Sequence, residues 1–187
     1  MINPFKKIAL GTAQFGMNYG IANKVGKVKE DEIKLILDTA HNNGISTLDT
    51  AKAYGESELI LGNIFKQNPK LSWNIITKFD TDKNIEKQYE NSIHILNNEP
   101  KMVLAHSLSV FLSKDFQNAA KLLSMKFSFL NIGVSLYNEK EIDIVLNSDF
   151  CPQIIQLPVN ILDTRLFHSG VLVRLFKLGI KIHARSV

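Results

Sequence analysis

The stretch that organises this chain is Leu48-Asp49-Thr50-Ala51-Lys52-Ala53-Tyr54-Gly55-Glu56-Ser57-Glu58. It continues a short apolar run that begins at Ile45, directly after Gly44, with polar interruptions only at Ser46 and Thr47, and the run ends on the acidic residue Asp49. Such a run between a glycine and a polar cluster is typical of a buried strand that enters a loop. The stretch therefore predicts an acid at a strand end and, five residues later, the tyrosine Tyr54 in a loop that faces the same space.

The rest of the chain repeats the order of a strand followed by a helix. Strands are expected at residues 7–12, 45–49, 74–78, 102–106, 130–135, 154–158 and 180–184, with helices at 29–43, 56–67, 85–96, 116–123, 139–146 and 169–178. This alternation predicts an α/β protein whose parallel strands are joined by helical crossovers. Both a doubly wound sheet and a (β/α)8 TIM barrel have this pattern.

Polar residues at the strand ends favour the barrel. Each of the seven strands ends on or near a different polar residue: Thr12, Asp49, Lys78, His106, Ser135, Gln156 and Arg185. A barrel gathers the carboxyl ends of all its strands in one mouth, whereas an open sheet spreads them along a line. A complete barrel needs about 250 residues. We therefore predict a single domain over residues 1–187, an incomplete barrel that ends at strand seven and lacks strand eight and the C-terminal helices.

Composition narrows the class of protein. The chain has 187 residues, of which 45% are hydrophobic and 21% charged, as in ordinary globular proteins with a sizeable core. No apolar run reaches the roughly 18 residues that a membrane helix needs. Cys151 is the single cysteine, so no internal disulfide can form and a reducing, cytoplasmic location is expected.

Charge and histidine spacing argue against two further classes of site. The net charge is +4, but the lysines are scattered along the chain, so we expect no nucleic-acid surface. The histidines outside the strand end at His106 have no metal-ligand spacing, and no metal site is expected; they are His41, His94, His168 and His183.

Four of the polar residues form a set with a clear chemistry. Asp49 beside Lys78 would hold that lysine charged, and a charged lysine beside Tyr54 lowers the pKa of the phenol. A tyrosine tuned in this way exchanges a proton near neutral pH as a general acid or base. The imidazole of His106 can orient a carbonyl oxygen. Together the four residues predict a site that reduces a carbonyl group when a hydride donor binds opposite.

Successive motifs along residues 7–187 resemble those of the aldo/keto reductase family. They are Gly11-Thr12-Ala13, Leu48-Asp49-Thr50-Ala51 with Tyr54-Gly55, Glu58 with Leu61-Gly62, Ile76-Thr77-Lys78, Leu104-Ala105-His106-Ser107 and Gly133-Val134-Ser135. The resemblance implies a (β/α)8 barrel that reduces aldehydes or ketones with NADPH, or catalyses the reverse oxidation. The loop at 14–26 and Gln156-Leu157-Pro158-Val159-Asn160 resemble the bacterial branch linked to surface-sugar gene clusters, which implies a sugar derivative as the small-molecule substrate.

The resemblance also implies roles for single residues. Tyr54 would be the proton donor, tuned by Lys78 with Asp49, and His106 would orient the substrate carbonyl. The cofactor would be held by Thr12, Ser135, Gln156 and Arg185, with Ser135 and Gln156 on the nicotinamide carboxamide.

The chain departs from the family pattern in three places. Leu136 stands where many members have asparagine. Arg185 replaces the aromatic residue that stacks on the nicotinamide, and we expect its guanidinium plane to stack instead. The segment that grips the adenosine 2′-phosphate is expected beyond residue 187, so NADH stays an alternative cofactor.

Two other functions stay open from the residues alone. Lys78 could act as a Schiff-base lysine in an aldolase-type barrel, although Asp49 should keep it protonated. The chain could also be a catalytically silent barrel remnant or an interaction subunit, because an unclosed barrel exposes a strand edge that invites self-association.

Overall fold

The computed structural model describes residues 4–69, 71–81 and 83–186. The chain divides into two compact units, the first built from residues 1–78 and 87–101 and the second from residues 79–86 and 102–187. All strand pairs described within each unit are parallel. The alternation of strands and helices predicted from the sequence is therefore present in both units.

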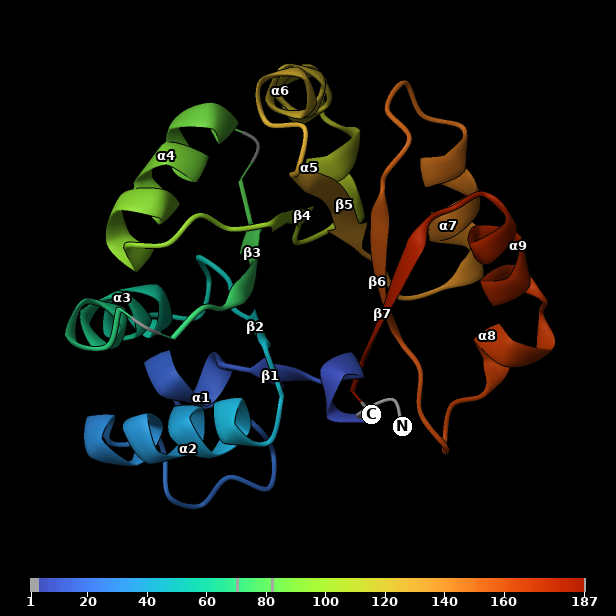
Figure 1. The fold of residues 1–187 in the computed structure, drawn as a ribbon. Helices are drawn as coiled ribbons and strands as arrows, with labels where there is room; N and C mark the ends of the chain where they lie inside the picture. Colours follow the sequence, from blue (N-terminus) through green and yellow to red (C-terminus); the bar gives the residue numbers. More distant parts are fainter. Residues whose placement is uncertain (1–3, 70, 82, 187) are drawn as a thin grey trace. The chain divides into compact units, whose positions relative to one another are not determined.

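The first unit is a three-stranded parallel sheet with its crossover helices (Figure 1). Its elements are the 3-10 helix η1 (Pro4–Lys7), β1 (Ala9–Gly11), α1 (Ala13–Gly16), α2 (Glu30–Asn42), β2 (Thr47–Asp49), α3 (Ser57–Gln67), β3 (Asn74–Phe79) and residues 87–96 of α4 (Ile85–Leu96). The pairing places Asp49 level with Gly11 on one side and with Ile76 on the other.

The core of the first unit lies between these helices and the sheet. In α2 the buried residues recur at three- and four-residue spacing, which puts them on one face of the helix: Ile33, Leu37 and Ala40. They pack in one cluster with the buried side of α3 and with Leu48 and Ile75 of the sheet. Burial of this apolar surface holds the ends of β2 and β3 in place.

The second unit is a four-stranded parallel sheet with helices of its own (Figure 1). Its elements are β4 (Met102–Ala105), α5 (Leu108–Leu112), α6 (Lys114–Lys126), β5 (Asn131–Ser135), α7 (Glu139–Leu146), β6 (Ile154–Pro158), α8 (Arg165–His168), α9 (Val171–Lys177) and β7 (Lys181–Arg185). The register sets Ser135 level with Gln156, and Gln156 level with His183. Three strand residues from β5, β6 and β7 thus lie in one row.

Helix boundaries differ from the sequence expectation where capping residues act. The helix expected at 116–123 begins at Lys114, because the side chain of Ser113 accepts a hydrogen bond from the backbone N–H of Phe116 at 3.1 Å. The helix expected at 169–178 begins only at Val171, because Gly170 has a left-handed backbone with φ of 77°. The short helices α1, α5 and α8 were not expected, since single turns carry no readable period.

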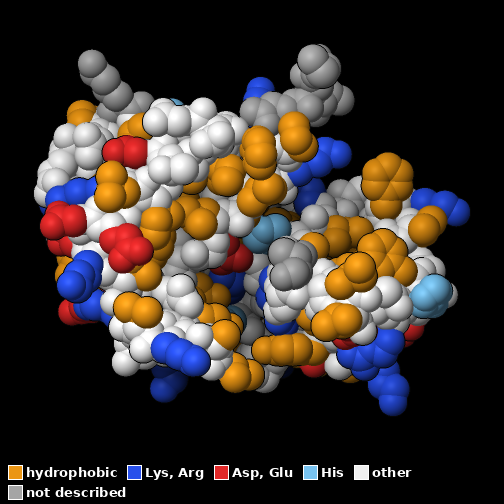
Figure 2. All heavy atoms as spheres, turned by 90° about the horizontal axis from the view of Figure 1, so that it is seen from below, with side chains coloured by type: hydrophobic (Ala, Val, Ile, Leu, Met, Phe, Trp, Pro, Cys, Tyr) orange, Lys and Arg blue, Asp and Glu red, His pale blue; other side chains and the backbone are white. Residues whose placement is uncertain are grey.

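Hydrophobic side chains are exposed on the part of the second unit that contains α8 and α9 (Figure 2). They include Ile161, Leu162, Phe167, Phe176 and Leu178. Among the described residues, no helix has the length and apolar character needed to cross a membrane.

Candidate active site

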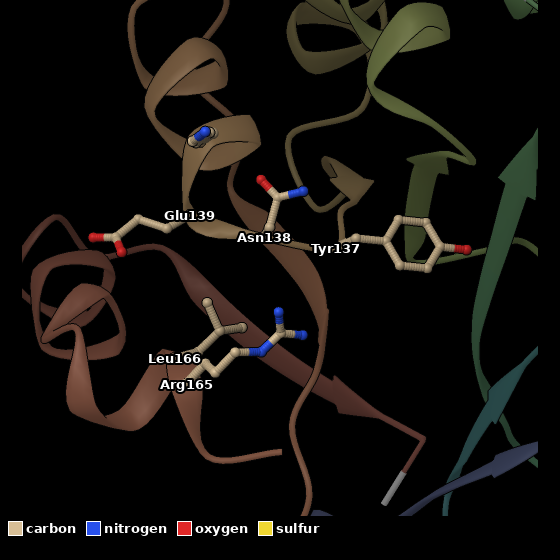
Figure 3. Close-up of a pocket in the computed structure, with 6 residues that line it drawn as sticks. Tyr137, Asn138, Glu139, Arg165 and Leu166 are labelled. Carbon is tan, nitrogen blue, oxygen red and sulfur yellow. The ribbon is translucent and has the colours of Figure 1, made fainter.

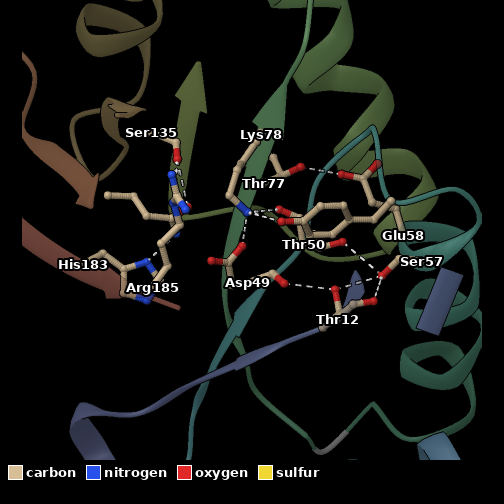
Figure 4. Close-up of polar contacts among 12 residues, drawn as sticks. Thr12, Asp49, Thr50, Ser57, Glu58, Thr77, Lys78, Ser135, His183 and Arg185 are labelled. Atoms are coloured by element: carbon tan, nitrogen blue, oxygen red, sulfur yellow. Dashed lines mark hydrogen bonds and ion pairs between the residues drawn. The ribbon is translucent and has the colours of Figure 1, made fainter. Parts of the chain in front are cut away.

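The first unit places a lysine and an aspartate in direct contact at the ends of two neighbouring strands. The ammonium of Lys78, in β3, forms an ion pair with the Oδ1 atom of Asp49, the last residue of β2 (Figure 4). Asp49 is level with Ile76, two residues before Lys78, so both side chains leave the same face of the sheet. The Lys78 side chain is only 1% exposed, and a buried ammonium of this kind needs such a partner.

Tyr54 lies within reach of the same ammonium. Lys78 Nζ donates to the Tyr54 hydroxyl at 3.3 Å and to the carbonyl oxygen of Thr50 at 2.9 Å. The Lys78 ammonium is also 4.8 Å from the centre of the Tyr54 ring. Three of the four residues expected to form the catalytic set, Asp49, Tyr54 and Lys78, are therefore brought together in this unit.

A cluster of buried hydroxyl groups holds the loop from residue 52 to residue 58, which carries Tyr54 and is called the Tyr54 loop below. Ser57 donates to the Oγ1 atom of Thr12 at 2.9 Å, and Thr50 donates to Ser57 at 3.1 Å. The Thr12 hydroxyl itself donates to the carbonyl oxygen of Asp49 at 3.0 Å. Thr12 is fully buried and joins β1 to the end of β2, and its expected part in cofactor binding stays a prediction.

The Tyr54 loop also packs backbone to backbone against α1. A Cβ atom built on Gly16 would lie 1.8 Å from the carbonyl oxygen of Tyr54 and 2.4 Å from the backbone nitrogen of Ser57. On the loop side, Gly55 has φ of 57°, and a Cβ there would lie 2.5 Å from the carbonyl oxygen of Gly16. Only glycine at both positions allows this approach, so α1 helps to set where Tyr54 lies.

Replacing Gly16 with alanine is expected to destabilise the protein by roughly 1–3 kcal/mol, because the new methyl group overlaps two backbone atoms of the Tyr54 loop. Chemical unfolding monitored by circular dichroism would measure the change. Gly11→Ala is the matched control, since a Cβ at Gly11 meets nothing within 4 Å. Equal stability of the two variants would show that the loop does not depend on this contact.

The second unit gathers three polar residues from β5, β6 and β7 in one row. The Ser135 hydroxyl donates to Gln156 Oε1 at 3.3 Å, and Gln156 Nε2 lies 2.8 Å from Nδ1 of His183. Ser135 and Gln156 are 4% and 1% exposed, so both belong to the buried polar set of the protein. His183 was not predicted as a site residue, and its place opposite Gln156 comes from the register of β6 and β7.

Arg185 is held at the end of β7 by contacts with the segment after β5. Its Nε atom donates to the Ser135 hydroxyl at 3.3 Å, and its Nη2 atom donates to the carbonyl oxygen of Leu136 at 3.2 Å. The centre of the guanidinium lies 4.3 Å from the centre of the Tyr137 ring, close enough for a cation–π contact. Three of the four expected cofactor residues, Ser135, Gln156 and Arg185, thus form one connected group.

His106 directly follows β4 in the second unit. Its backbone N–H donates to the carbonyl oxygen of Phe79 at 2.8 Å, and the next residue, Ser107, caps α5. The backbone of His106 is therefore fixed at a strand end, as the sequence predicted. Its expected action on a substrate carbonyl stays a prediction.

A cavity of about 450 Å³ lies beside the start of α7 in the second unit (Figure 3). It is lined by Tyr137, Asn138, Glu139, Lys140, Arg165 and Leu166. Tyr137 is the residue whose ring carries the Arg185 guanidinium, so the cavity borders the Ser135–Gln156–Arg185 group.

Comparison with known protein families identifies the family of the chain. The family model of the aldo/keto reductase family matches residues 7–187. The chain belongs to the aldo/keto reductase family. A comparison with curated proteins finds no match.

Solved aldo/keto reductases share the fold at low sequence identity. A structure from Pseudomonas aeruginosa, described as a putative aldo-keto reductase, is 20% identical with a TM-score of 0.77, over 94% of this chain and 71% of that one. An aldo-keto reductase from Bacillus halodurans, in its holo form, is 18% identical with a TM-score of 0.73, over 95% and 61%. One from Klebsiella pneumoniae, in complex with NADP and acetate, is 16% identical with a TM-score of 0.69, over 96% and 63%.

These likenesses confirm the fold class predicted from the sequence. The chain has an incomplete (β/α)8 barrel of the aldo/keto reductase type, with seven strands in chain order. It spans 61% to 71% of the length of these three solved aldo/keto reductases.

Several residues that contact the expected site residues were not singled out from the sequence. They are Gly16, Lys52, Ser57 and His183, and Glu58 was noted only as part of a motif. Glu58 did carry a signal, since it is a charged residue at the start of α3, directly before the apolar residues Leu59, Ile60 and Leu61. The other four residues make contacts in the tertiary structure that no local sequence pattern predicts.

Proposed function

We propose that this chain carries the carbonyl-reducing site of an NADPH-dependent aldo/keto reductase, with Tyr54 as the proton donor. The observation that supports it most is the ammonium of Lys78, which contacts both the Asp49 carboxylate and, at 3.3 Å, the Tyr54 hydroxyl. The reaction reduces an aldehyde or ketone to an alcohol, or runs in reverse.

The proposed role of the Lys78 ammonium follows from its charge. A cation next to a phenol favours the phenolate, so the Tyr54 hydroxyl gives up its proton more readily than a free tyrosine does. Asp49 keeps Lys78 charged, which also speaks against a Schiff-base role for this lysine. His106 is proposed to donate a hydrogen bond to the carbonyl oxygen and so orient it toward Tyr54.

The Ser135–Gln156–Arg185 group fits a nicotinamide cofactor. A hydroxyl and an amide lie side by side, and each can both donate and accept hydrogen bonds, as the carboxamide of nicotinamide requires. The flat guanidinium of Arg185 offers a stacking surface next to them. When bound, the nicotinamide supplies the hydride, while the protein orients the reacting groups and sets the electrostatic environment around them. We propose NADPH, with NADH as the alternative.

The substrate is proposed to be a small carbonyl compound, and a sugar derivative is the class that the bacterial branch resemblance favours. A reducing compartment such as the cytoplasm suits the single exposed cysteine.

Self-association through a sheet edge is also proposed, and light scattering after gel filtration would detect it. An observed monomer at all concentrations would contradict that last point.

Two measurements on the full chain test the proposed function. NADPH binding is followed by the change in its fluorescence on titration with protein, and turnover by the loss of NADPH absorbance with a panel of small and sugar aldehydes. We expect both binding and turnover. Binding without turnover of any aldehyde would favour a catalytically silent barrel, and absence of both would overturn the proposal.

Replacing Gln156 with methionine is expected to weaken NADPH binding by about 3- to 10-fold, because methionine keeps the volume but loses the amide hydrogen bonds, each worth roughly 0.5–1.5 kcal/mol. Fluorescence titration measures the affinity. The matched control is Gln153→Met. Gln153 is a second glutamine of the same unit, and its amide oxygen accepts a hydrogen bond from the backbone N–H of Ile132. An unchanged NADPH affinity in Gln156→Met would remove Gln156 from the cofactor site.

A further inference from the structure

A second buried ion pair lies in the first unit, close to the one between Lys78 and Asp49. The ammonium of Lys52 is 2.6 Å from Oε2 of Glu58, and the two side chains are 19% and 6% exposed. Glutamate is almost never buried to this degree unless it is paired. The other contacts of Glu58 and Lys52 show which elements this ion pair connects.

Glu58 connects three elements of the first unit, and Figure 4 shows its contact with Thr77 of β3. Its Oε1 atom accepts from the hydroxyl of Thr77, in β3, at 2.6 Å and from the hydroxyl of Ser92, in α4, at 3.3 Å. Thr77 directly precedes Lys78, and side chains alternate along a strand, so Glu58 holds β3 from the face opposite to Asp49. The end of β3 is thus held by one carboxylate on each face.

Lys52 connects the same strand end to the loop that carries Tyr54. Its backbone N–H donates to the carbonyl oxygen of Lys78 at 3.0 Å, while its side chain binds Glu58. Tyr54 lies two residues after Lys52 and four residues before Glu58 in the chain. The ion pair therefore closes a short loop across its two ends, with Tyr54 inside it.

We propose that Lys52 and Glu58 are positioning residues, whose ion pair holds the loop from residue 52 to residue 58 so that the Tyr54 hydroxyl stays at the Lys78 ammonium. Its catalytic consequence rests on the proposed function, but the placement of Tyr54 does not. Misplacing a reacting group by about 1 Å costs up to about 100-fold in rate. A buried, hydrogen-bonded ion pair resists such a displacement better than an exposed one, because solvent does not screen it.

The test compares Lys52→Met with Lys27→Met in the full chain. Lys27 pairs with Glu56 of the same loop, also at 2.6 Å, but its side chain is 41% exposed, and exposed pairs contribute little. Lys52→Arg keeps the charge and serves as the conservative rescue. Thermal melting first shows that each variant folds.

The first readout follows Tyr54 directly and needs no activity. Fluorine-labelled tyrosine gives one NMR signal for each of the four tyrosines, and Tyr54→Phe identifies the signal of Tyr54. Burial raises the pKa of the Tyr89 phenol well above its ordinary value, so its signal is a non-titrating reference. We expect Lys52→Met to shift and broaden the Tyr54 signal and to raise the midpoint of its titration, while Lys27→Met and Lys52→Arg leave both close to wild type.

The second readout is turnover of NADPH with an aldehyde. Lys52→Met is expected to lower kcat by roughly 10- to 100-fold without a matching change in KM, and Lys52→Arg to restore most of it. If the wild-type protein shows no turnover but Lys52→Met shifts the Tyr54 signal, the proposed function is refuted and the positioning role stands. Identical Tyr54 signals in Lys52→Met and Lys27→Met would overturn the positioning role.

If Lys52→Met does not fold, the same NMR measurement is made on the variant Thr77→Val. It removes one hydrogen bond to Glu58 and keeps the shape of the side chain and both charges of the pair. A smaller shift of the Tyr54 signal in the same direction is expected. An unchanged signal in this variant would overturn the proposal.

Discussion

Replacing Tyr54 with phenylalanine is expected to lower kcat for aldehyde reduction by about 10²- to 10⁴-fold, the usual contribution of a positioned general acid. The ring and its packing remain, and only the hydroxyl that contacts Lys78 at 3.3 Å is lost. NADPH affinity should stay nearly unchanged, because the proposed cofactor group lies on β5, β6 and β7. The loss of NADPH absorbance under saturating aldehyde measures the effect.

Tyr19→Phe is the matched control for this experiment. The Tyr19 ring lies 6.4 Å from the Tyr54 ring, but Tyr19 is 55% exposed and has no described contact with Lys78. It should therefore keep wild-type turnover. Turnover of Tyr54→Phe equal to that of Tyr19→Phe would refute Tyr54 as the proton donor, whatever the family resemblance.

Replacing Asp49 with asparagine is expected to destabilise the protein by roughly 3–5 kcal/mol, the usual cost of breaking a buried ion pair from one side. The reason is that the Lys78 ammonium, at 1% exposure, would lose the carboxylate that offsets the cost of burying its charge. Lys78→Met should cost less, because the carboxylate left behind is 14% exposed and therefore better solvated. Urea unfolding followed by circular dichroism gives the free energies.

The double variant Asp49→Asn with Lys78→Met separates the ion pair from packing. Because this variant removes both charges of the pair, it should recover part of the stability that Asp49→Asn loses. A double variant as unstable as the sum of the two single variants would show that the charges do not interact. Loss of turnover is expected in all three variants, since Lys78→Met removes the ammonium next to Tyr54 and Asp49→Asn removes the carboxylate that pairs with this ammonium.

The sequence alone was sufficient to predict the barrel class and to place several of the proposed site residues at strand ends. Asp49, Lys78, Ser135 and Arg185 are each the last or next-to-last residue of a short parallel strand, and parallel strands place such residues at one edge. Hydrophobic periodicity located the long helices for the same reason, because burial of one face requires a fixed spacing along the chain. Short helices such as α1 lack that spacing and were missed.

Only the tertiary structure shows what supports the loop that carries Tyr54. Gly16 approaches the Tyr54 loop from a helix that lies about 40 residues earlier in the chain, and Thr77 and Ser92 reach Glu58 from 19 and 34 residues away. Contacts over such separations depend on how strands and helices pack, and packing leaves no local pattern that a reader of the sequence can recognise. Strand order and polarity therefore indicate which polar groups lie at the strand ends, whereas packing over long separations determines how firmly they are held.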